Sequence, residues 1–253
     1  MKKKEITDLD RLAVRSRPEG APVMHQDWHK LLFMHWRIPA ETLRPLIPER
    51  LTIDTFDGSA WVGVTPFTMS NVRPSFVPSL LVPPISGLSQ MHELNVRTYV
   101  YLDKVPGVWF FSLDTNSGLA VQGARAFFHL PYFNADISME QKGGSFSYKL
   151  SRTEEGSAAA EFKARWKTGE TLPYAQPGTL EFFLIERYCL YSARGKKLYR
   201  ARIHHQPWPL QEAAVSSFSS SMLEADGLPT PAGEPLLHFG EEVNVDIWPP
   251  EEI

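Results

Sequence analysis

Turn-forming residue pairs divide this chain into short runs of alternating or apolar residues. Asp57-Gly58, Pro106-Gly107 and Gly143-Gly144 each lie between two such runs. Pairs of this kind are typical of tight turns that reverse the chain between two antiparallel strands. The sequence shows no βαβ rhythm and no internal repeat. The spacing therefore predicts a mainly β (α+β) fold, in which one antiparallel sheet closes or curves strongly.

The expected elements are hairpins interrupted by a few short helices. Strands are expected in the runs 28–36, 51–64, 91–113, 132–151, 158–166, 188–204, 208–218 and 236–248. Short helices are expected at 39–46, 117–128 and 178–186, because of proline placement, near-helical spacing and an N-cap at Thr179, respectively.

The composition is that of one ordinary globular domain. Of the 253 residues, 43% are hydrophobic and 22% are charged, so a sizeable core can form. We expect a polar lead-in over 1–22 and a single domain over 23–253. The net charge of −3 and the pI of about 6.3 provide no electrostatic attraction to nucleic acid or to anionic membranes.

Cysteine usage and hydropathy favour a cytoplasmic location. Cys189 is the only cysteine, so no intrachain disulfide can form. Residues 1–17 lack the apolar core of a signal peptide, and no apolar run approaches the length that spans a membrane. We therefore expect a cytoplasmic protein without a membrane segment.

A proline-rich stretch, 74–89, is not suited to a central strand or to a helix interior. Long loops of this kind in compact domains often form the rim of a site. The apolar part, 76–85, is also a candidate for covering an interface in a homo-oligomer.

Polar side chains alternate along the strand expected at 91–102. Glu93, Asn95, Arg97 and Tyr99 fall on one face, and apolar residues dominate the other. In an open sheet the polar face would be solvated. In a closed sheet the same face would line the interior and form a charged, hydrogen-bonding pocket. The alternation is compatible with both interpretations.

Motifs for metals and common cofactors are not apparent. The eight histidines include no HExxH arrangement and no Cys/His cluster, so they are interpreted as structural or surface residues, and no metal is expected. The sequence has no P-loop, no Rossmann fingerprint and no Gly-x-Ser-x-Gly elbow. We therefore expect no cofactor.

A set of short strings carries a family resemblance over roughly residues 23–248. They are His35-Trp36-Arg37-Ile38-Pro39, Leu46-Ile47-Pro48, Glu93-Leu94-Asn95-Val96-Arg97-Thr98-Tyr99-Val100, Gly107-Val108-Trp109-Phe110-Phe111-Ser112-Leu113-Asp114, Ala124-Arg125-Ala126-Phe127-Phe128-His129-Leu130-Pro131-Tyr132 and Glu186-Arg187-Tyr188. Together they resemble the YqjF-like family, the domain of unknown function numbered 2071. The resemblance implies the fold of the acetoacetate decarboxylase superfamily, an antiparallel sheet rolled into a cone-like barrel around a buried site.

The resemblance also implies which residues occupy the decarboxylase positions. In the decarboxylase a lysine that follows a proline forms a Schiff base with a β-keto acid, and a buried glutamate and an arginine assist. Here Pro131 fits that proline, so Tyr132 and Phe133 stand where lysines would be. Glu93 fits the glutamate and Arg37 fits the arginine. A phenol cannot form an imine, so the resemblance implies no Schiff-base decarboxylation.

The candidate site residues follow from the strand pattern and the resemblance. Glu93 and Tyr132 are candidates for acid–base chemistry, and Arg37, Asn95, Arg97 and Arg125 are candidates for ligand binding. Each has a structural alternative. Tyr132 fits an edge aromatic equally well, and for Arg125 an ion pair with Glu93 or Glu186 is the favoured interpretation.

Three functions remain open from the sequence. The first is a buried small-molecule pocket that binds a carboxylate or keto-type metabolite. The second is a lyase or isomerase-type enzyme that uses Glu93 with Arg37 and Tyr132 for acid–base catalysis. The third is an oligomeric scaffold with no ligand. Whether the protein is an enzyme, and which ligand it takes, are not decided by the sequence.

Overall fold

The structure is a computed structural model that describes residues 6–77 and 90–253. Its strands are β1 (Met24–Ile38), β2 (Thr52–Ile53), β3 (Ala60–Pro74), β4 (Gln90–Leu102), β5 (Val105–Thr115), β6 (Tyr132–Lys142), β7 (Ser145–Arg152), β8 (Glu161–Thr171), β9 (Cys189–Arg194), β10 (Lys197–His204), β11 (Leu210–Ser220), β12 (Leu236–Ile247) and β13 (Glu251–Glu252). Its helices are α1 (Asp8–Ala13), α2 (Ala40–Leu43), the 3-10 helix η1 (Arg44–Leu46), α3 (Gly118–Phe127), α4 (Leu180–Ile185) and α5 (Met222–Ala225).

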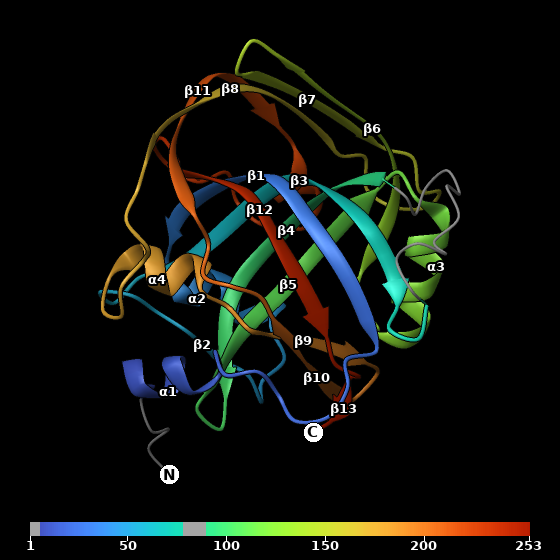
Figure 1. The fold of residues 1–253 in the computed structure, drawn as a ribbon, viewed down its shortest axis with the longest axis vertical. Helices are drawn as coiled ribbons and strands as arrows, with labels where there is room; N and C mark the ends of the chain where they lie inside the picture. The colour runs from blue at the N-terminus through green and yellow to red at the C-terminus, as the bar shows by residue number, and fades with distance from the viewer. Residues whose placement is uncertain (1–5, 78–89) are drawn as a thin grey trace.

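Hydrogen bonds join the strands into two closed rings that have a common wall. The wall consists of β12, β1, β3, β4 and β5 in that order. β6, β7, β8 and β11 complete one ring, and β9 and β10 complete the other, through pairing of β10 with β12. Figure 1 shows β6, β7 and β8 at the top of the view and β9 and β10 at the bottom. The mainly β fold with a closed sheet, which the sequence predicts, is confirmed.

Each ring encloses a hydrophobic core. The first core includes Phe146, Tyr148 and Trp166 from β7 and β8, and the second includes Phe183 from α4 and Ile203 from β10. Strands of the common wall contribute to both cores, because successive side chains point to opposite sides of a strand. Where both faces of such a strand are covered, its polar residues are enclosed too.

Strand β4 shows this arrangement most clearly. Leu94, Val96 and Val100 belong to the first core, and Met91 and Tyr99 belong to the second. The polar face that the sequence left undecided is therefore an inner face of the closed sheet.

The lead-in is attached to the rest of the chain through α1. Thr7 caps this helix and forms a capping box with Asp10. Arg11 extends from it and donates two hydrogen bonds, of 2.6 and 2.7 Å, to the buried carboxylate of Asp54.

Two details of the strand pairing differ from the sequence-based expectation. The expected hairpin over 51–64 reduces to one bridge between Phe56 and Ser59, and β2 pairs with β4 instead of β3. β5 also runs parallel to β6 and to β9, whereas only antiparallel pairs were expected. The first parallel pair is possible because α3 carries the chain back between β5 and β6.

Most of the proline-rich stretch lies outside the described residues, as do the expected rim and most of the expected interface segment. Of the part that is described, Phe76 is exposed. Among the described helices, none is long and apolar enough to cross a membrane.

Candidate functional site

A group of polar side chains lies on the inner face of the common wall, next to the second core. We call it the inner polar cluster. Its members are His35 from β1, Thr65 from β3, Glu93, Asn95, Arg97 and Tyr99 from β4, and Tyr132 from β6. Strand register brings them together, because Asn95 lies opposite Thr65 and Gly63 lies opposite both His35 and Arg97.

Glu93 and Tyr132 form the pair at one end of the cluster. The Tyr132 hydroxyl donates a hydrogen bond of 2.8 Å to Oε2 of Glu93. Glu93 is only 2% exposed, so this carboxyl group is removed from bulk water. The start of β6 positions Tyr132, because β6 pairs with β5 at Leu113 and β5 pairs with β4.

The environment of Glu93 favours its protonated form. Burial raises the pKa of this carboxyl group to about 8, and hydrogen bonds from Tyr132 and Asn95 offset the rise only in part. No ion pair joins Glu93 to an arginine within the described residues. At neutral pH Glu93 therefore carries a proton and can act as an acid.

His35 and Tyr99 form a second pair toward the other end of the cluster. Nε2 of His35 lies 2.6 Å from the Tyr99 hydroxyl, and both residues are fully buried. Burial first, and then nearby cations such as Arg97, hold the pKa of His35 well below its ordinary value, so the imidazole is neutral at pH 7. Gly63 makes room for this pair, because an added Cβ would lie 3.0 Å from the His35 ring.

Two arginines flank Tyr99. The Arg97 guanidinium lies 5.4 Å from the Phe33 ring centroid, and the Arg187 guanidinium lies 4.6 Å from the Tyr99 ring centroid. Arg187 also donates a 2.8 Å hydrogen bond to Asp54, which Arg11 already contacts. Arg97 forms no ion pair with any described residue.

Several polar atoms in and beside the cluster have no hydrogen-bond partner among the described residues. They are Nδ1 of His35, Oγ1 of Thr65, Oδ1 of Asn95, Nε of Arg97, Nη2 of Arg187 and Nδ1 of His238. Buried polar atoms in folded proteins usually have partners, so a concentration of such atoms indicates a place where a ligand or water binds. These atoms include donors on two cations, which suits an anion.

The structure places the remaining sequence-based candidates outside this cluster. Arg37 is exposed at the end of β1, and its guanidinium lies 5.0 Å from the Trp61 ring centroid. Arg125 is also exposed. Its Nε donates a 2.8 Å hydrogen bond to the backbone carbonyl of Tyr132, and its Nη2 pairs with Glu154 at 2.8 Å. Arg125 thus binds the backbone of Tyr132. Its ion-pair partner is Glu154, whereas the sequence analysis had considered Glu93 or Glu186.

Sequence reasoning did not single out His35, Thr65 or Arg187 as site residues. A signal was present for His35, since it shares a strand face with Leu31 and Phe33, both of which are buried. Arg187 lies two residues after the last residue of the buried helix α4, which was a signal that its charge could be enclosed. Thr65 gave no signal of its own, because only the pairing with Asn95 places it in the cluster.

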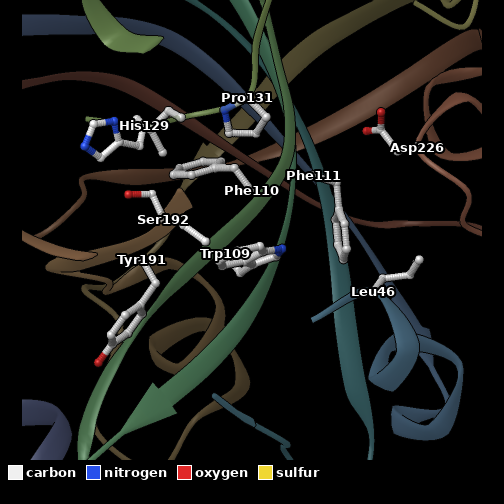
Figure 2. A pocket seen from close by; sticks show the side chains of 11 residues that line it. Leu46, Trp109, Phe110, Phe111, His129, Pro131, Tyr191, Ser192 and Asp226 are labelled. Carbon is white, nitrogen blue, oxygen red and sulfur yellow. The ribbon is translucent and has the colours of Figure 1, made fainter. Parts of the chain in front are cut away.

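A separate cavity of about 470 Å³ opens beside β5. It lies where β9 and β6, which pair with different parts of the same edge of β5, leave that edge uncovered. Figure 2 shows Trp109, Phe110 and Phe111 along its wall, with Pro131 and Asp226 on other sides. Phe110 lies opposite Arg97 in the strand register, and Pro131 precedes Tyr132, so the cavity approaches the inner polar cluster from outside.

A buried ion-pair network lies on the side of β5 away from the inner polar cluster, and its member Asp226 also lines the cavity. Arg152 donates hydrogen bonds of 2.7 and 2.8 Å to the two carboxylate oxygens of Asp114. Asp226 lies 3.5 Å from the same guanidinium and accepts a hydrogen bond from Ser112. Burial raises the pKa of Asp226 to about 6. Because each polar group in this network has partners, it is best interpreted as structural.

Comparisons with known proteins agree with this architecture. The model of the DUF2071 family, described as an uncharacterized conserved protein, matches residues 25–244. Uncharacterized protein YqjF of Bacillus subtilis (strain 168) is 40% identical over 234 residues, which cover 92% of this chain and 94% of that protein.

Solved structures with low sequence identity have a similar fold. The enduracididine biosynthesis enzyme MppR complexed with pyruvate matches with a TM-score of 0.65 and 12% identity, covering 94% of this chain and 92% of that one. Acetoacetate decarboxylase from Legionella pneumophila matches with a TM-score of 0.61 and 9% identity, covering 100% and 98%. The chain therefore belongs to the DUF2071 family, to which the YqjF-like resemblance had pointed, and its fold is that of acetoacetate decarboxylase-like proteins.

Proposed function

We propose that this protein binds a small carboxylate or keto acid at the inner polar cluster. The observation that carries the proposal is the set of unpartnered polar atoms around Asn95 and Arg97. A carboxylate accepts hydrogen bonds through both oxygens, so it matches guanidinium donors better than a neutral ligand does. The Asn95 oxygen remains an acceptor for a hydroxyl group or a protonated group of the same ligand.

The surroundings of the cluster strengthen such an interaction. The second core supplies Phe33, Trp61 and Tyr99, all of which are buried. Hydrogen bonds to charged groups are stronger where little water competes for them. A small acid enclosed here would form few hydrogen bonds, each of them strengthened by the exclusion of water.

Acid–base catalysis on the bound ligand is the second candidate function. It is favoured by the pKa of Glu93, which lies near 8 and leaves the carboxyl group protonated at neutral pH. A buried carboxylic acid of this kind can donate a proton to a ligand oxygen, with Tyr132 orienting it. A Schiff-base route has no support in the described residues, because no lysine among them is buried.

Binding is tested with pyruvate, chosen because MppR is a fold neighbour solved with pyruvate. Isothermal titration calorimetry compares the wild type with Arg97→Gln and with Arg165→Gln, an exposed arginine on β8 that serves as the control. We expect Arg97→Gln to weaken binding by about tenfold or more and the control to bind like the wild type. Equal binding by all three proteins, or no binding of pyruvate by the wild type, would contradict this assignment. An Arg37→Gln variant shows in parallel whether the exposed arginine takes part.

Catalysis is tested by the exchange of pyruvate C3 protons with deuterated water, followed by proton NMR. Exchange requires a proton to pass from C3 to a base, here the solvent or buffer, while the carbonyl oxygen accepts a hydrogen bond or a proton from Glu93. We expect wild-type protein to accelerate exchange and Glu93→Gln to lose about a hundredfold of that acceleration. Acceleration that survives in Glu93→Gln would exclude Glu93 as the acid.

A further inference from the structure

The inner polar cluster and its neighbours hold more positive charge than negative charge. Arg97 contributes one positive charge without an ion-pair partner among the described residues. Arg11 and Arg187 both contact the buried carboxylate of Asp54, and Arg11 also lies 4.0 Å from the exposed carboxylate of Asp8, so Arg187 shares its ion-pair partner with a second guanidinium group. Glu93 supplies no compensation, because it pairs with Tyr132 and not with a cation.

Arg97 and Arg187 act on the same two side chains. Arg97 and Arg187 each lower the pKa of His35 and each oppose the rise that burial causes in the pKa of Tyr99. The rings of His35 and Tyr99 are 6.0 Å apart, with Arg187 against the Tyr99 ring. The two cations therefore flank one small region between β1 and β4.

Glu186 is also buried, but it accepts hydrogen bonds from Tyr188 and from the backbone of Trp208 and forms no ion pair with a described arginine. Aromatic rings at Phe33, Tyr99 and Phe183 face the guanidinium groups, but a ring quadrupole does not neutralise an ion. Residues 78–89 contain no Asp or Glu, and Glu5 is the only acid outside the described ranges. Enclosed charges without a counter-charge are costly, so an anionic ligand is the natural partner.

We propose that the ligand of this site is a dianion with two separated negative groups, namely a dicarboxylate, in which one carboxylate contacts Arg97 and the other contacts Arg187. The proposal rests on the carboxylate-binding function proposed above and narrows it from one charge to two. Two unpartnered donors, Nε of Arg97 and Nη2 of Arg187, belong to different side chains, which favours separated groups over one compact anion.

The test compares ligands that differ by one charge. Calorimetry in a low-chloride buffer measures succinate and glutarate against their monomethyl esters, with pyruvate as a simple monocarboxylate and inorganic phosphate as a compact dianion. We expect the better diacid to bind at least about tenfold more tightly than its monoester. Arg97→Gln and Arg187→Gln should each abolish this preference, whereas Arg165→Gln should keep it.

The outcomes separate the two proposals. If diacids and monoesters bind equally to the wild type, and Arg97→Gln weakens both, the dicarboxylate inference fails while carboxylate binding stands. If phosphate binds more tightly than every diacid, the separated charges are refuted. If none of the carboxylates binds, both proposals fail. If Arg187→Gln does not fold, the comparison of diacid with monoester on the wild type and on Arg97→Gln still shows whether the site prefers a dicarboxylate.

Discussion

The hydroxyl of Tyr132, at the first position of β6, donates a 2.8 Å hydrogen bond to Oε2 of Glu93 on β4 of the common wall. The contact connects a strand of one ring to the inner face that borders the core of the other ring. It also places two weak acids in one buried environment, where Glu93 raises the pKa of Tyr132 and the hydrogen bond from Tyr132 lowers the pKa of Glu93.

Replacing Tyr132 by phenylalanine removes one donor from a buried carboxyl group. We expect Tyr132→Phe to lower the free energy of unfolding by about 1–2 kcal/mol, measured by urea denaturation below the pKa of Glu93. The pKa of Glu93 should rise further, because the Tyr132 hydrogen bond is one of the interactions that lower it. Carbon NMR of labelled glutamate measures this shift. Tyr174→Phe, at an exposed tyrosine, should change neither quantity. A downward shift of the Glu93 pKa would refute the role assigned to the hydroxyl.

The stability of the protein should depend on pH through Glu93. In the unfolded chain this carboxyl group ionises near 4.5, and in the folded protein near 8. Between these values the folded state holds the extra proton, so the free energy of unfolding falls as pH rises. The slope from this group is about 1.4 kcal/mol per pH unit within that window. Urea titrations at several pH values should show this slope in the wild type, and Glu93→Gln should lack it. Parallel curves for the two proteins would contradict the assignment.

A lysine at position 132 should allow the protein to form a Schiff base, which the tyrosine cannot do. The resemblance aligns Tyr132 with the Schiff-base lysine, and burial at this position would lower the pKa of an introduced amine. With acetoacetate and borohydride, mass spectrometry should detect a reduced adduct on Tyr132→Lys and none on the wild type. Phe127→Lys, at an exposed position of α3, is the control for nonspecific labelling. An adduct on a wild-type lysine would show that an amine nucleophile exists elsewhere.

Replacement of Gly63 by any residue with a side chain should be unfavourable. An added Cβ would lie 3.0 Å from the His35 ring and 3.4 Å from Cγ of Arg97, so both cluster residues would have to move. We expect Gly63→Ala to destabilise the fold by about 1–3 kcal/mol and to weaken ligand binding. Gly123→Ala is the matched control, because a Cβ there meets no atom within 4 Å and alanine favours the helix. Full stability and binding in Gly63→Ala would show that the cluster does not need this close approach.

The Arg152 network should be far more sensitive than ion pairs at the surface. Arg152→Met leaves Asp114 and Asp226 buried without their cation, which should lower the free energy of unfolding by about 3–5 kcal/mol. Arg200→Met removes a pair with the exposed Glu251 and should cost less than about 1 kcal/mol. Denaturant titrations of both variants check this ordering, and a smaller loss for Arg152→Met would refute it.

Local sequence patterns were sufficient to predict much of this fold. Alternation along 91–102 separated the two faces of β4 correctly, and the Gly143-Gly144 turn predicted the β6–β7 hairpin. Thr179 caps α4 as expected. These features depend on interactions between residues that are close in sequence, so they can be predicted from local sequence patterns.

Features that depend on distant partners could not be predicted in the same way. Pairing of β2 with β4, closure of the second ring by β10 and β12, and the parallel strands beside β5 all join segments far apart in the chain. The sequence pattern identified Glu93 and Tyr132 as candidates, but no local signal distinguishes the partly buried Arg97 from the exposed Arg37. That difference arises because β1 has lost β12 as a partner by Arg37 and pairs only with β3 there, whereas β4 pairs with both β3 and β5 at Arg97.

The five-stranded wall that both rings share makes each half of the molecule a structural requirement of the other. Removing β6 to β8 would strip the outer side of β4 and expose the apolar row at Leu94 and Val96, even though the cation-rich inner side belongs to the opposite ring. A fragment containing only the smaller ring should therefore aggregate instead of folding alone, and duplication or circular rearrangement of either half would have to carry the entire wall with it.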